Sequence, residues 1–183
     1  MRIIGGSFRG RRLSEVGKGD AAAHLRPTAD RVRESLFNIL GSRIDLQDAR
    51  VLDMFAGTGA LGLEALSRGA GQACFVESGR ASLKLLNNNI ALCGVEGQAQ
   101  VLSRDARRLG DNPQAPYDLI FLDPPYGKSM GEAALATAMQ GGWIAQDALI
   151  VWEENKPVIA PHGLKLLDER RYGDTVMRLF TRD

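Results

Sequence analysis

The sequence is poor in the residues that build redox, metal and nucleophilic sites, with two cysteines and two histidines among 183 residues. Cys74 lies in an apolar run and Cys93 stands beside a glycine, without the spacing of metal ligands, so we expect two buried reduced thiols. His24 and His162 are far apart in the sequence, which gives little support to a zinc site or a histidine-based triad. We therefore expect no metal.

Long hydrophobic runs are also missing. The apolar runs are short and interrupted by glycine or charge, and the chain begins with Arg2 and two glycines rather than an apolar signal core. This pattern predicts a cytoplasmic protein that does not bind membranes. With 44% hydrophobic and 25% charged residues, the composition is typical of a globular domain, which we expect to be a monomer.

The net charge of +1 hides an excess of positive charge near the N-terminus. Residues 1–43 hold nine Lys and Arg against four Asp and Glu, whereas residues 44–183 hold fourteen against eighteen. We predict a basic extension over 1–43 and a catalytic domain over 44–183, in one structural unit. Six cations are candidates for phosphate contacts, namely Arg2, Arg9, Arg11, Arg12, Arg26 and, further along, Lys128. The alternative is a solvated basic face.

The basic extension itself contains two expected elements. Arg2 to Leu13 is typical of a short glycine-turned hairpin, which we expect to form an arm more than a part of the core. A helix is predicted from Pro27-Thr28, with Thr28 as N-cap, because apolar residues recur at helical spacing up to Gly41.

From Arg50 onward, short apolar runs alternate with helical segments. The expected strands and helices cover 51–53, a helix to 69, 73–77, a helix near 80–92, 99–102, 119–122, a helix near 130–139, and 149–152. This alternation predicts an α/β fold with a parallel sheet covered on both faces. The segments 164–167 and 176–180 flank Gly173-Asp174 and predict a closing antiparallel hairpin.

A glycine-rich segment follows the first expected strand. Asp53 is followed by Gly57, Gly59 and Gly62 in the spacing GxGxxG, and Glu77 ends the next expected strand. Such a loop allows close approach of a ligand, and an acid at that distance is suited to ribose hydroxyls. We predict that a nucleoside cofactor binds to these residues together with Ala56, Thr58 and Ser78.

Two features favour S-adenosylmethionine over a nicotinamide dinucleotide. The Asp53 carboxylate lies in the first loop, where it would repel a pyrophosphate but attract the amino group of a methionine moiety. Asp105, with Ala106 beside it, follows the third expected strand and is suited to the adenine amino group. Because Asp53, Glu77, Asp105 and Asp123 all stand at or just after expected strand ends, we expect them to converge on one site.

The run Asp123-Pro124-Pro125-Tyr126 follows the fourth expected strand. Two prolines remove two backbone donors, so this turn offers acceptors, the Asp123 carboxylate and the Pro124 carbonyl, beside an aromatic ring. This is the complement of a planar exocyclic amino group, with two N–H donors and a flat π-face. An ordinary strand-to-loop turn is the alternative.

These motifs resemble those of class I S-adenosylmethionine-dependent methyltransferases that modify exocyclic amino nitrogens. With the segments at 2–10 and 26–40, the chain resembles more closely the RsmD family of small-subunit rRNA guanine-N2 methyltransferases. The resemblance implies a seven-stranded sheet with an antiparallel last strand. It further implies a guanine of 16S rRNA, in an assembled or assembling 30S subunit, as substrate, and Asp123, Pro124, Pro125 and Tyr126 as the catalytic residues.

Other functions remain open at this point. A DNA adenine-N6 or protein glutamine-N5 methyltransferase uses nearly the same turn. A nicotinamide-dependent oxidoreductase is supported by the glycine spacing, but by nothing suited to hydride chemistry. A non-enzymatic RNA-binding assembly factor would need no intact site, and the acids at all four expected strand ends argue against it.

Overall fold

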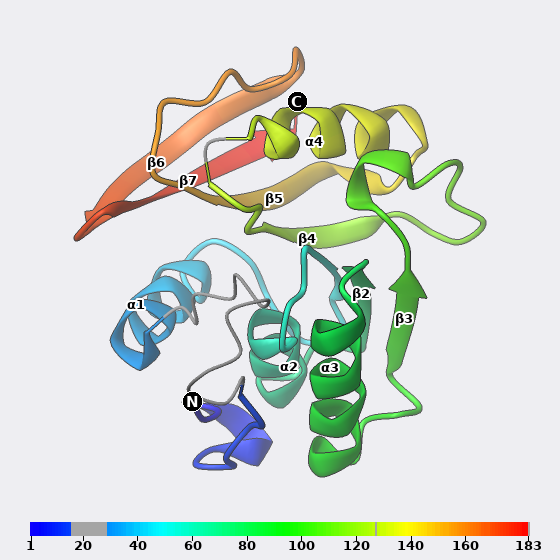
Figure 1. Ribbon diagram of the computed structural model, residues 1–183. Helices are drawn as coiled ribbons and strands as arrows, with labels where there is room; N and C mark the ends of the chain where they lie inside the picture. The colour runs from blue at the N-terminus through cyan, green and yellow to red at the C-terminus, as the bar shows by residue number, and fades with distance from the viewer. Residues whose placement is uncertain (16–28, 127, 183) are drawn as a thin grey trace.

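The protein is built on one mixed sheet, seen in a computed structural model that describes residues 1–15, 29–126 and 128–182 (Figure 1). Its seven strands follow the order β3-β2-β1-β4-β5-β7-β6. The first five pair in parallel, and β7 pairs antiparallel with both β5 and β6. The strands are β1 (Arg50–Met54), β2 (Gln72–Glu77), β3 (Ala99–Ser103), β4 (Tyr117–Leu122), β5 (Ile144–Glu154), β6 (Leu164–Tyr172) and β7 (Thr175–Arg182). The predicted α/β fold of the class I methyltransferase type is confirmed.

Helices cover both faces of the sheet. Figure 1 shows α4 (Met130–Gln140) on one face, and α1 (Asp30–Leu40), α2 (Ala60–Ser67) and α3 (Arg80–Cys93) on the other. Short 3-10 turns, η1 (Gly6–Phe8) and η2 (Ala106–Arg108), complete the elements. The predicted N-cap Thr28 lies outside the described residues, in which α1 follows Ala29. Within the described part of the chain, no helix is both long and apolar enough to cross a membrane.

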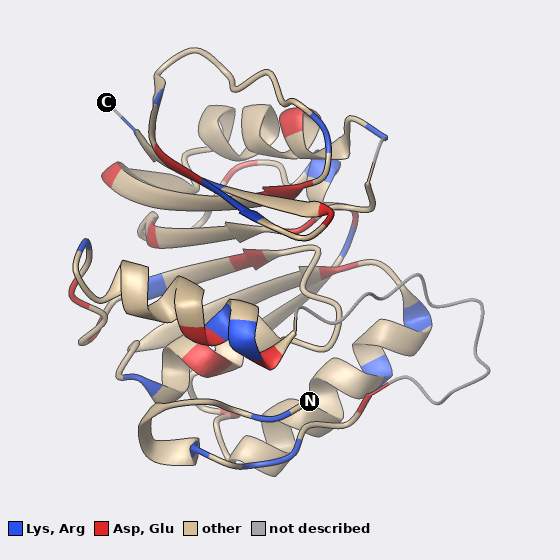
Figure 2. Ribbon diagram, turned by 90° about the vertical axis from the view of Figure 1, so that its left-hand side faces the viewer, with Lys and Arg blue, Asp and Glu red and all other residues tan. Residues whose placement is uncertain are grey.

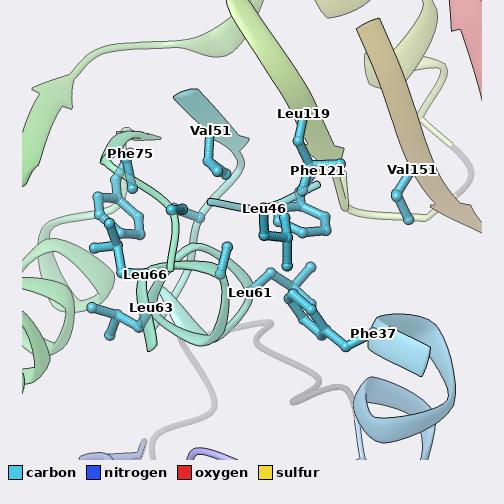
Figure 3. Packing of buried hydrophobic residues seen from close by; sticks show 14 of the residues in the cluster. Phe37, Leu46, Val51, Leu61, Leu63, Leu66, Phe75, Leu119, Phe121 and Val151 are labelled. Atoms are coloured by element: carbon cyan, nitrogen blue, oxygen red, sulfur yellow. The ribbon is translucent and has the colours of Figure 1, made fainter. Parts of the chain in front are cut away.

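Each face of the sheet has its own hydrophobic cluster, because successive residues of a strand point to opposite sides. On the face of α1, α2 and α3, Phe37 packs against Phe121 with ring centroids 5.8 Å apart (Figure 3). On the face of α4, Trp152 is fully buried and its ring lies where a side chain at Gly131 would stand. Trp143 is buried as well, and Cys74 and Cys93 are buried as predicted.

The first residues of the chain belong to the core, so the expectation of an arm is wrong for this segment. Ile3 is 0% exposed and Leu13 5%, and both join the cluster of α1, α2 and α3. The predicted hairpin exists in irregular form, as a single antiparallel bridge between Arg2 and Arg12 around η1. The segment is fixed by the buried carboxylate of Glu64 in α2, which accepts hydrogen bonds from two backbone amides, those of Ile4 at 2.7 Å and Gly5 at 2.8 Å.

The sheet ends in the predicted antiparallel hairpin, with strands longer than the sequence indicated. β6 and β7 pair from Leu164 opposite Arg182 to Tyr172 opposite Thr175. Since β7 lies between β5 and β6, Met177 and Leu179 point into the cluster of α1, α2 and α3. The hairpin therefore belongs to the core of the sheet, while β6 forms its exposed edge.

Candidate active site

The carboxyl ends of β1, β2, β4 and β5 meet at one edge of the sheet, because these strands run in parallel. Asp53 and Glu77 stand at the ends of β1 and β2, and Asp123 follows β4 directly. The backbone amide of Asp123 lies 3.5 Å from the carbonyl oxygen of Met54 in β1. Asp53 and Asp123 are close enough for the charge of one to raise the pKa of the other. The convergence predicted for these two acids is therefore seen in the structure.

The glycine loop connects β1 to the start of α2 through a backbone with several positive φ angles. Phe55 has φ 60°, Gly57 57° and Gly59 79°. A positive φ is uncommon for an aromatic residue, and strain of this kind collects at functional sites. A Cβ at Gly59 would stand 2.4 Å from Leu86, and one at Gly62 2.4 Å from the ring of Phe75. The second and third glycines are thus required by packing inside the protein itself.

Asp53 is buried and accepts a hydrogen bond of 2.9 Å from the amide of Gly62 in α2. Burial raises its pKa to about 8, and the nearby Glu77 carboxylate adds to the rise, while the Gly62 bond opposes it. A buried carboxyl with such a pKa favours a cationic partner, which would stabilise the ionised form. The ammonium group predicted for this place fits that requirement.

Glu77 connects the loop after β1 with the loop after β2. Its Oε2 accepts from the amide of Gly57 at 2.8 Å, and its Oε1 accepts from those of Ser78 at 2.8 Å and Gly79 at 2.7 Å. A carboxylate has about four acceptor positions, so about one remains, on Oε2, for a ribose hydroxyl. The predicted role of Glu77 is compatible with this arrangement, and Glu77 also holds the glycine loop in place.

Asp105 lies before η2, whose first turn it caps. Its carboxylate accepts from the backbone amide of Arg107 at 2.9 Å and pairs with the guanidinium of that residue at 2.6 Å. Hydrogen bonds from Arg107 hold the pKa of Asp105 below its ordinary value. A contact between this carboxylate and adenine would therefore require Arg107 to move. Ala106, the neighbour assigned to the same role, is buried in the cluster on the α4 face.

The Asp-Pro-Pro-Tyr turn is anchored through its tyrosine. The Tyr126 hydroxyl donates to Glu153 Oε1 at 2.7 Å and lies 2.8 Å from Thr175 Oγ1. Pro124 is buried, whereas Pro125 is exposed to solvent, so the turn leaves the protein interior between the two prolines. Strands β5 and β7 therefore fix the ring that is predicted to stack on the substrate base.

Sequence reasoning missed Glu153 and Thr175. Glu153 is buried near the end of β5, and with Glu154 it raises the pKa of Asp123 above the ordinary value, in addition to burial, the largest cause. The rule that ligands bind at the carboxyl ends of parallel strands applies to Glu153 as it does to the other acids. Thr175 carries no such signal, because its place depends on the pairing of β7 with strands far away in the sequence.

The cations predicted to bind nucleic acid are exposed but dispersed. Arg2 pairs with Asp30 at 3.4 Å, and Arg11 donates to the carbonyl oxygen of Leu92. The remaining described members of the set are exposed, namely Arg9, Arg12 and Lys128. The bend of the segment beside Arg9 contacts the end of α2, since the amide of Phe8 donates to Ser67, so it lies away from the glycine loop. Arg26 lies outside the described residues.

Comparison with known proteins now decides the family. The family model described as "Conserved hypothetical protein 95" matches residues 1–181. The ribosomal RNA small subunit methyltransferase D of Escherichia coli is 40% identical over 100% of this chain and 90% of its own length. The chain belongs to the RsmD family. The protein of the same name from Haemophilus influenzae is 37% identical over 98% of this chain and 93% of its own length.

Solved structures support the RsmD assignment. A candidate methyltransferase from Escherichia coli superimposes with a TM-score of 0.85 at 37% identity, over 100% of this chain and 98% of that one. A candidate RNA methyltransferase from Pyrococcus horikoshii reaches 0.69 at 17% identity, over 93% and 94%, and so shows the common fold. As an RsmD member, the chain is a methyltransferase, and this removes the support for a nicotinamide-dependent oxidoreductase.

Proposed function

We propose that this protein transfers a methyl group from S-adenosylmethionine to the exocyclic N2 amino group of a guanine in 16S rRNA of the small ribosomal subunit. One observation carries the proposal: the acceptor turn beginning at Asp123 follows β4, which pairs directly with β1, the strand that carries Asp53 and leads into the glycine loop. The turn that would bind the amino nitrogen therefore lies beside the glycine loop that would bind the cofactor. The names of the Escherichia coli and Haemophilus influenzae relatives support a small-subunit rRNA substrate.

The electrostatics of the site support the choice of cofactor. Asp123 lies close to three other carboxylates, and each of them raises its pKa in addition to burial. They belong to Glu153, Asp53 and Glu154. Such a cluster repels a pyrophosphate and attracts a cationic ligand. S-adenosylmethionine supplies a cationic sulfonium with a transferable methyl group, and Asp53, the amide-rich glycine loop and Glu77 would hold it.

The residues of the turn act mainly by positioning the substrate. The lone pair of a guanine amino group is delocalised into the ring, so the nitrogen is a poor nucleophile. The Asp123 carboxyl and the Pro124 carbonyl accept hydrogen bonds from its two N–H groups. These bonds favour a pyramidal nitrogen whose lone pair points toward the methyl group. Alignment of reacting groups can contribute roughly 7–11 kcal/mol, more than proton transfer commonly adds.

The guanine must leave its stack to reach the turn. Unstacking costs a few kcal/mol and less in a loop than in a duplex, which favours a looped RNA target. Stacking on the Tyr126 ring recovers part of this cost, at about 1–3 kcal/mol per base. The hydroxyl bonds to Glu153 and Thr175 keep the ring in one orientation before the base arrives.

The decisive experiment measures transfer of labelled methyl from S-adenosylmethionine to 30S subunits lacking base methylation, to naked 16S rRNA and to duplex DNA, followed by nucleoside identification. We expect N2-methylguanosine from the ribosomal substrates. Asp123→Ala should lose transfer while still binding the cofactor, and Asp111→Ala, at an exposed position before β4, should keep both. Methyladenine in DNA would reassign the substrate, and transfer that survives in Asp123→Ala would overturn the role of the turn.

A further inference from the structure

A polar groove of about 500 Å³ runs between α1 and the edge strand β6. Its lining includes Arg31, Glu34, Ser35, Asn38, Arg43 and Arg170. None of these residues belongs to the site at the strand ends, and the sequence did not indicate the groove. Figure 2 shows Lys and Arg on α1 and on the hairpin that runs beside it, on the side of the molecule that faces the viewer.

The groove follows from the pattern of each element. Helix α1 buries Leu36, Phe37 and Leu40, so its opposite, polar face points away from the core. Strand β6 turns Asp168, Arg170 and Tyr172 toward the same side, because these residues pair with β7 residues on the α1 face of the sheet. The polar face of α1 and the polar side chains of β6 therefore lie beside each other.

Two polar contacts connect these surfaces. Ser35 Oγ lies 2.7 Å from the Tyr172 hydroxyl, and the Arg43 guanidinium lies 3.4 Å from the Asp168 carboxylate. Asp168 also pairs with Arg170 at 3.2 Å, so one carboxylate serves two guanidinium groups. The lining holds three arginines, Arg31, Arg43 and Arg170, and one acid, Glu34, and so keeps an excess of positive charge. Such a surface attracts an anionic chain.

One end of the groove reaches the catalytic turn through neighbouring residues. Tyr172, in contact with Ser35, pairs in the hairpin with Thr175. Thr175 Oγ1 in turn lies 2.8 Å from the hydroxyl of Tyr126. A strand that places a base on Tyr126 would thus meet the groove with its adjoining nucleotides.

We propose that this groove binds the RNA strand that flanks the target nucleotide, through phosphate contacts with Arg31 and Arg170. The proposal rests on the function proposed above, since it concerns the same substrate. Phosphate contacts carry no sequence information, but they fix the register of a strand, and here they would present one nucleotide to the turn. The groove therefore supplies binding and register, while the strand-end site supplies chemistry.

The test compares three variants in binding to a labelled 16S rRNA transcript over a salt series. The double variant Arg31→Ala/Arg170→Ala removes both contacts. The matched control Arg171→Ala removes an exposed arginine from the next position of β6, which pairs with Val176 and so points to the opposite face. Arg31→Lys/Arg170→Lys keeps the charge at both positions and controls for loss of the side chains.

The expected effect is a smaller salt dependence. Each phosphate contact to a single strand contributes a slope of about 0.7 in log affinity against log salt, so the double alanine variant should lose about 1.4. Between about 50 and 200 mM salt, wild-type affinity should then fall about sevenfold more than that of the variant. The lysine variant should keep the wild-type slope, and Arg171→Ala should keep both the wild-type slope and the wild-type kcat.

The outcome separates this inference from the proposed function. If the double alanine variant has the same slope as Arg171→Ala, the groove does not bind phosphates, whatever the enzyme methylates. If wild-type protein transfers no methyl to rRNA, the proposed function fails by the assay described above, before any variant is considered. The proposal would also fail if Arg171→Ala reduced the salt slope as much as the double variant does. The slope would then depend on the net charge of the protein and not on the groove.

Discussion

The raised pKa of Asp53 predicts that the affinity for S-adenosylmethionine depends on pH. In the cofactor-free protein burial raises this pKa to about 8, so near neutral pH most molecules carry a proton on Asp53. Binding of an ammonium group requires the ionised carboxylate, and the proton must leave. Affinity should therefore increase as the pH rises toward the pKa, and then level off.

The size of the effect follows from the fraction of ionised Asp53. With a pKa of about 8, competition by the proton weakens binding about 100-fold near pH 6 and about fourfold near pH 7.5. The dissociation constant of S-adenosylmethionine should thus fall about 25-fold over this interval. Titration calorimetry in buffers of different ionisation enthalpy should detect release of about 0.9 proton per site near pH 7.

Asp53→Asn provides the matched control, because it keeps the shape of the side chain and removes the titrating group. It should bind more weakly and lose the pH slope. Among the described residues, Glu77 and Asp123 are acids whose charges interact with that of Asp53, so Glu77→Gln should lower the midpoint of the slope. A dissociation constant that stays flat between about pH 6 and pH 7.5 in the wild type, or a slope that persists in Asp53→Asn, would refute the reasoning.

Three further predictions concern packing and anchoring. Gly62→Ala places a Cβ 2.4 Å from the Phe75 ring and should lower the free energy of unfolding by about 1–3 kcal/mol in urea titration, whereas Gly97→Ala, with open space around it, should not. Glu64→Ala leaves two backbone amides and an arginine without their acceptor and should cost about 3 kcal/mol in the same measurement; a cost below about 1 kcal/mol would contradict the anchoring role. Glu153→Ala removes the anchor of Tyr126 and should lower kcat about tenfold if the ring positions the base. Glu153→Gln, whose amide oxygen still accepts a hydrogen bond from the hydroxyl, should keep most of kcat; equal losses would point to charge instead.

Local patterns in the sequence were sufficient for the elements of the fold. The alternation of apolar runs with helical spacing predicted all seven strands, because buried parallel strands and amphipathic helices have distinct periods. The rule for strand ends then placed Asp53 and Asp123 at one edge. Asp53 and Asp123 are close because β1 pairs with β4. The sequence predicts a parallel sheet, but it does not by itself state which strands are neighbours.

Contacts between distant parts of the chain were beyond local patterns. Ile3 and Leu13 each stand beside an arginine, and the charge suggested an arm, yet both side chains are buried in the cluster of α1, α2 and α3. The Glu64 carboxylate holds this segment through the amide of Ile4, 60 residues away in the sequence. Thr175 reaches Tyr126 because β7 enters the sheet between β5 and β6. Such contacts depend on which strands become neighbours, and periodicity does not contain that information.

The position of β7 also determines when the sheet can be completed during synthesis. A chain emerging from a ribosome can form β1 to β5 in order, but the place beside β5 is filled by residues 175–182, which emerge after all of them. Until then Tyr126 has no contact with Thr175. The hydrophobic cluster that contains Ile3 is also still without Met177 and Leu179. A chain without residues 175–182 would thus lack one partner of the Tyr126 hydroxyl and two buried side chains of the cluster that α1, α2 and α3 cover.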